Sequence, residues 1–98
     1  MNARLNEGVE PPAAEFSLDR CRPGWCGTIV ELAVPAHPHY AGTELERRLL
    51  EMGFVEGARV EVRHEGPLGR DPMAVLIDNT LIAVRRRDAA VILVKAEA

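Results

Sequence analysis

A chain of 98 residues has room for one domain with a single modest core. Its hydrophobic fraction of 47% and charged fraction of 28% are those of an ordinary globular protein, which excludes wholesale disorder. The net charge of −3 and the aromatic fraction of 4% disfavour nucleic acid as a partner, because phosphate binders need a basic face and single strands need stacking platforms. No apolar run approaches the roughly 18–20 residues that span a bilayer, so direct membrane insertion is not expected.

The N-terminal segment, residues 1–15, combines Gly8, Pro11 and Pro12 with polar and small residues and shows no sustained periodicity. This composition predicts a flexible tail, followed by a single domain over residues 16–96. The segment lacks the apolar stretch of a secretory signal, so we expect a cytoplasmic protein whose two cysteines stay reduced.

The first regular elements are a strand and a helix. Residues 28–34 (TIVELAV) are rich in β-branched and aliphatic side chains and predict a strand. Thr43 as N-cap with Glu46 three residues later is a capping box, and Gly53 is suited to end the helix in a left-handed conformation. One apolar stripe at helical spacing is formed by Leu45, Leu49 and Met52.

The rest of the chain reads as short strands. Alternating or β-branched segments predict strands at 58–65, 73–77, 80–84 and 91–94, with a loop at 66–69, a tight turn at 78–79 and a helical turn at 85–90. The sequence therefore predicts a mainly β fold: a small antiparallel barrel of about five strands with one α-helix, which leaves few free edges.

One group of side chains could bind a transition metal ion. Two thiolates and two imidazoles could close a tetrahedral Zn²⁺ site, or bind Fe²⁺ more weakly, through Cys21, Cys26, His37 and His39. The His-x-His pair departs from the usual ligand spacing. The alternative, two unremarkable thiols and two loop histidines, stays open.

Enzyme motifs are absent. The chain contains no GxxxxGK[ST], GxSxG or HExxH. The charges of Glu61, His64, Glu65 and Asp71 fit the solvated face of a strand better than an acid–base pair. We therefore expect a binding module that catalyses nothing and holds no cofactor tightly.

Three separated segments resemble one family in order. Residues 48–62 (RLLEMGFVEGARVEV), 66–72 (GPLGRDP) and 82–94 (IAVRRRDAAVILV) are similar to the FeoA family, small cytoplasmic proteins of the bacterial ferrous-iron uptake system. The resemblance covers roughly residues 16–95. It implies an SH3-like barrel that acts as a non-enzymatic accessory factor for FeoB, the membrane permease with a GTP-binding domain that carries Fe²⁺ inward. The cysteine and histidine cluster is not part of the family pattern, so the resemblance implies no function for it.

The residues after the helix suggest how such a domain could meet the permease. Met52, Phe54 and Val55 could form an exposed apolar anchor, since large apolar anchors concentrate binding energy; the alternative is that they cap the core. Arg85 and Arg86 could meet an acidic patch on the partner, or could lie on a solvated turn. The alternative function is a metal-binding sensor or carrier of Zn²⁺ or Fe²⁺, and self-association into a homo-oligomer is left open.

Overall fold

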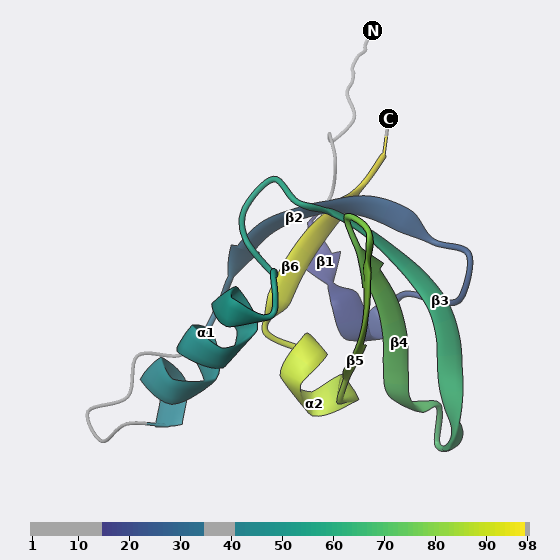
Figure 1. Cartoon of the computed structure of the whole chain (residues 1–98). Helices are drawn as coiled ribbons and strands as arrows, with labels where there is room; N and C mark the ends of the chain where they lie inside the picture. Colours follow the sequence, from purple (N-terminus) through teal and green to yellow (C-terminus); the bar gives the residue numbers. More distant parts are fainter. Residues whose placement is uncertain (1–14, 35–40, 98) are drawn as a thin grey trace, which may run out of the picture.

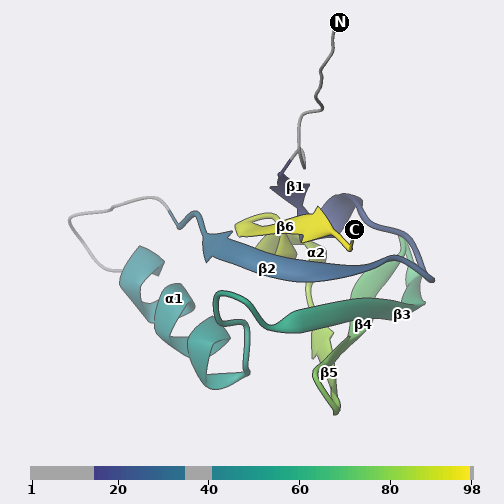
Figure 2. The same cartoon turned by 90° about the horizontal axis from the view of Figure 1, so that it is seen from above.

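The computed structural model describes residues 15–34 and 41–97. Its elements, in chain order, are β1 (Phe16–Ser17), the 3₁₀ helix η1 (Leu18–Arg20), β2 (Cys26–Leu32), α1 (Ala41–Glu51), β3 (Arg59–Leu68), β4 (Asp71–Ile77), β5 (Thr80–Val84), α2 (Arg86–Ala89) and β6 (Ile92–Ala96). Figures 1 and 2 show a strongly bent sheet with α1 beside the end of β2 and the start of β3.

The six strands form one antiparallel sheet in the order β1-β6-β2-β3-β4-β5. Register shifts interrupt the β2–β6 pairing between Ile29 and Glu31 and the β3–β4 pairing at two places. Such irregularities bend a strand and increase its twist, which curls a short sheet toward a barrel. The predicted fold class is confirmed: the domain is mainly β, antiparallel and barrel-like, and α1 is the one helix of more than a single turn among the described residues.

The core lies inside the bend and is apolar throughout. The alternation predicted for β3 and β4 is confirmed, because Val60, Val62, Met73 and Val75 are fully buried while their chain neighbours are not. The other fully buried large side chains come from η1, α1, the turn after α1, and β6: Leu18, Leu49, Phe54, Ile92 and Val94.

The elements differ from the sequence prediction at several places. The loop expected at 66–69 is shorter, because β3 runs on to Leu68 and β4 already begins at Asp71. The helix begins at Ala41, before the predicted cap Thr43. A sixth strand, β1, has only two residues and pairs with β6, with Phe16 opposite Val94. A run of two residues is too short to show periodicity, so no local pattern predicts this strand.

The described residues include no helix that is both long enough and apolar enough to cross a membrane.

Candidate functional site

Helix α1 is positioned by the way it ends. The Gly53 N–H donates to the Leu50 carbonyl and the Phe54 N–H donates to the Leu49 carbonyl, both at 3.0 Å, the pair of bonds of a Schellman motif. Gly53 has φ +108°, which confirms the predicted left-handed end of the helix. The hydrophobic contact that accompanies this motif is available here, because Leu49 and Phe54 are both buried in the core.

The helix approaches the sheet through the predicted apolar stripe. Leu49 is 1% exposed, while Leu45 and Met52 are partly buried and pack against the core. The outer face carries charge: Arg47 bonds to Glu44 and Glu51 on successive turns. Because only one residue of the stripe is fully buried, α1 does not close completely against β5.

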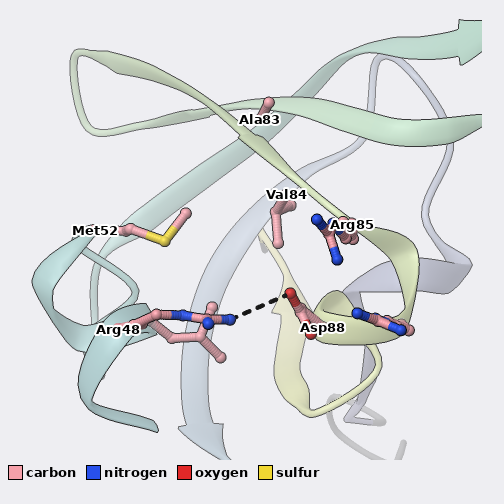
Figure 3. Close-up of a pocket in the computed structure, with 8 residues that line it drawn as sticks. Arg48, Met52, Ala83, Val84, Arg85 and Asp88 are labelled. Carbon is pink, nitrogen blue, oxygen red and sulfur yellow. Dashed lines mark ion pairs between the residues drawn. The ribbon is translucent and has the colours of Figure 1, made fainter. Parts of the chain in front are cut away.

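A groove of about 310 Å³ lies between α1, β5 and α2 (Figure 3). Two buried residues, Leu49 of α1 and Val84 of β5, line it together with the more exposed Met52. Its remaining lining is polar or small and comes from Arg48, Ala83, Arg85, Arg87 and Asp88. Arg48 faces Asp88 across the groove, with 3.8 Å between Nη2 and Oδ2 (Figure 3).

The three apolar residues expected to form a docking anchor are separated by the fold. Val55 is 43% exposed and Met52 lines the groove, so both are accessible. Phe54 is fully buried, which corrects the expectation that it is exposed: the Schellman turn directs its side chain into the barrel. For Phe54 the core-capping alternative holds.

The consecutive arginines also divide. Arg85 and Arg87 are exposed and line the groove. The Arg86 side chain is only 15% exposed and pairs with Glu65, 2.8 Å from Nη2 to Oε2. It also donates to the carbonyls of Arg70 and Asp19, so one guanidinium joins β3, the β3–β4 turn and η1. Arg86 is therefore committed within the domain and is not available as the partner contact predicted for it.

Of the four residues suggested for a metal site, the structure describes the two cysteines. Cys21 is 3% exposed, and burial, with the nearby Asp19 carboxylate adding to it, raises the pKa of its thiol to about 11. Cys26 is half-buried and, like Cys21, not in a disulfide. His37 and His39 lie outside the described residues. Within residues 15–34 and 41–97 there is no group of three metal-ligating side chains, and the four-residue site stays a prediction.

Sequence reasoning missed two residues that shape the groove, Arg48 and Asp88. Their positions on α1 and α2 were predicted, but nothing in the sequence indicated that these two helices face each other. A useful signal was present in the composition of β5: Thr80–Val84 has no charged residue, which suggests a strand whose edge is not protected.

Solved structures of similar fold define the class of this domain. The chain is similar in fold to a part of a manganese-dependent transcriptional repressor, at a TM-score of 0.71 with 21% identity over 89% of this chain and 44% of that one. A FeoA protein from Stenotrophomonas maltophilia, a prokaryotic SH3 domain protein solved in complex with zinc, is 28% identical at a TM-score of 0.66, over 81% of this chain and 88% of that one. The domain is thus an SH3-like barrel.

The family follows from the sequence itself. A family model described as the FeoA domain matches residues 16–96, and the chain belongs to this family. Iron(II) transport protein A from Clostridium thermocellum is 34% identical at a TM-score of 0.70, over 83% of this chain and 45% of that one. The FeoA protein of Chlorobium tepidum is 30% identical at a TM-score of 0.69, over 85% and 71%. None of the curated protein sequences compared with the chain matches it.

Proposed function

We propose that the chain is a non-enzymatic accessory protein of bacterial ferrous-iron uptake, which acts in the cytoplasm by docking on a FeoB-type permease. The observation that carries this proposal is the match of the FeoA domain over residues 16–96, almost the whole described part of the chain. Proteins with this fold and related sequence support a role in transport: one is an iron(II) transport protein, and another is described as a candidate activating factor of ferrous iron transport.

The described surface supports docking more than chemistry. The groove beside α1 combines buried apolar residues with an arginine rim, and Val55 is exposed on the turn that follows α1. Large apolar side chains next to a concave surface are typical anchors of protein interfaces. Among the described residues, the groove offers arginines and one aspartate as its charged groups, a set suited to binding a carboxylate-bearing partner.

The test is a titration of the domain against the purified permease, with the permease empty, bound to GDP and bound to a GTP analogue. We expect saturable binding in at least one of these states. Val55→Asp places a charge on the exposed anchor and should weaken binding about tenfold or more, because an interface would have to bury an unpaired carboxylate. Phe54 is unsuitable for this test because the side chain belongs to the core.

The matched control is Ala96→Asp, which adds the same charge at an exposed position on β6. It should bind like the unmodified chain. Equal loss in both variants would indicate a general charge effect and would remove Val55 from the interface. No binding in any nucleotide state would overturn the proposed function.

A further inference from the structure

We propose that the groove between α1 and β5 binds an extended, acidic segment of the partner protein. That segment adds a strand to the free edge of β5 and places its carboxylates on Arg85 and Arg87. The proposal rests on the proposed function, because it assumes that the domain acts by docking, and it specifies what the groove recognises.

Strand β5 forms an unprotected edge of the sheet. β5 is the last strand of the sheet and pairs only with β4 among the described residues. Natural edge strands are usually shielded by charged residues, proline, bulges or shortness. The opposite edge, β1, is protected by having two residues only. β5 has five residues, Thr-Leu-Ile-Ala-Val, with no charge, no proline and a regular pairing, and its Leu81 is 58% exposed.

The free edge of β5 opens into the groove. In Figure 1, β5 lies between β4 and the two helices, so its unpaired side faces α1 and α2. The groove is lined on one side by Ala83 and Val84 of β5 and on the other by Leu49 and Met52 of α1. An added strand runs about 4.8 Å from β5, and alternate side chains then point toward the apolar floor. Edge pairing together with side-chain pockets is the usual basis of recognition by strand addition.

The charged side chains around the groove favour an acidic ligand. Three arginines and one aspartate line the groove, although the chain as a whole has a net charge of −3. Asp88 already has Arg48 as a partner, and within the described residues Arg85 and Arg87 make no ion pair. A guanidinium binds a carboxylate through two parallel hydrogen bonds, so the rim selects an acidic segment over a basic one. Nucleic acid is the weaker candidate, because it has no polypeptide backbone to pair with a strand edge and the chain as a whole is acidic.

The experiment uses the full chain, labelled with ¹⁵N, and a synthetic peptide of alternating valine and glutamate, about nine residues long so that it overhangs β5. We expect saturable binding with chemical-shift changes confined to β5, α1 and α2. The unpaired amide protons of β5 should also become protected from hydrogen exchange when the peptide is present. Shift changes centred elsewhere, or no binding at millimolar peptide, would overturn the proposal.

Two further peptides test the contacts with the arginines and the strand addition separately. With lysine in place of glutamate, binding should weaken about tenfold or more, since the arginine rim would meet like charges. With the valine–glutamate peptide N-methylated at every backbone nitrogen, binding should weaken to a similar extent, because neither edge of the peptide keeps a donor for strand pairing. Unchanged binding of the methylated peptide would rule out strand addition, and unchanged binding of the lysine peptide would rule out the arginine rim.

The matched variants test the site. Arg85→Glu/Arg87→Glu should lose the valine–glutamate peptide and gain affinity for the lysine peptide. Arg63→Glu/Lys95→Glu changes the net charge equally at two exposed residues of β3 and β6, and should bind the valine–glutamate peptide within about twofold of the unmodified chain. Equal losses in both variants would indicate non-specific attraction and overturn the proposal. So would preferential binding of an oligonucleotide, or a dimer detected by sedimentation whose β5 amide protons are protected from exchange without peptide.

Titration of the same two variants against the permease distinguishes this inference from the proposed function. Weaker binding by Arg85→Glu/Arg87→Glu alone supports the groove as the docking site. Equal binding by the unmodified chain and both variants would rule out the groove as the docking site and leave the proposed docking in place. Absence of binding by the unmodified chain would instead remove the proposed function.

Discussion

Arg86 and Glu65 form an ion pair in which both side chains are withdrawn from solvent, with 2.8 Å between Nη2 and Oε2 and exposures of 15% and 17%. The pair connects α2 to β3, and the remaining donors of Arg86 reach two backbone carbonyls. Replacing Arg86 with alanine leaves the Glu65 carboxylate without this partner and the carbonyls without theirs.

We expect Arg86→Ala to lower the free energy of unfolding by about 2–4 kcal/mol, measured by urea denaturation. Arg86→Lys should recover only part of this, because one ammonium group cannot reach three acceptors in the fork geometry of a guanidinium. Arg87→Ala is the control and should stay within about 0.5 kcal/mol of the unmodified chain. A loss of less than 0.5 kcal/mol for Arg86→Ala would show that the pair is not structural.

The turn after α1 predicts a contrast between neighbours. Phe54→Ala removes a fully buried aromatic ring and should cost about 3–5 kcal/mol of unfolding free energy. Val55→Ala alters a side chain that is 43% exposed and should cost less than about 1 kcal/mol. Thermal and urea unfolding of the two variants would check this; similar costs at both positions would contradict the described orientation of the turn.

The buried thiol of Cys21 predicts a loss of stability at high pH. Its pKa is raised from the ordinary 9.0 to about 11, so the folded chain holds this proton more tightly than the unfolded chain. The contribution is complete below pH 9 and is lost as the pH rises from about 9 to about 11. Urea denaturation over this range should show a steeper decline for the unmodified chain than for Cys21→Ala, which serves as the control. Parallel declines would mean that the thiol ionises equally in both states.

The metal-binding alternative can be tested independently of docking. Cysteine binds Zn²⁺ as a thiolate, and the burial of Cys21, which raises the pKa of its thiol, opposes that form. We expect Cys21→Ala/Cys26→Ala to bind the permease as the unmodified chain does, and calorimetric titration with Zn²⁺ to give the same weak heats for both chains. Stoichiometric zinc binding that disappears in the double variant would instead favour a metal carrier.

Most of the fold could be predicted because its signals are local. The period-2 pattern of β3 and β4 and the 3.6-residue stripe of α1 depend on neighbouring residues only. The left-handed backbone conformations at Gly53 and Asp78 follow from residue type. The two-residue strand β1 exists only because β6 is there to pair with it. Its formation is a tertiary effect that a local pattern cannot contain.

The candidate site was only partly predictable, for the same reason. Nothing in the sequence distinguishes the three consecutive arginines 85–87. At the start of the short helix α2, Arg86 turns inward and pairs with Glu65, while its two neighbours are exposed. Val55 and Phe54 are likewise adjacent and differ in burial because a turn separates their directions. The groove itself needs Arg48 and Asp88 on different helices, so it is defined by packing and by no single segment.

The pairing of Phe16 with Val94 places the first and last strands of the domain next to each other. The chain enters the barrel along β1 beside the strand on which it leaves, so both points of attachment sit together at one side, while α1 and α2 lie at the other (Figure 1). A fluorescent reporter, or a tether to a surface, could therefore be joined at either point without covering the groove. The same layout would keep the groove accessible if the domain were attached to a larger assembly at this side.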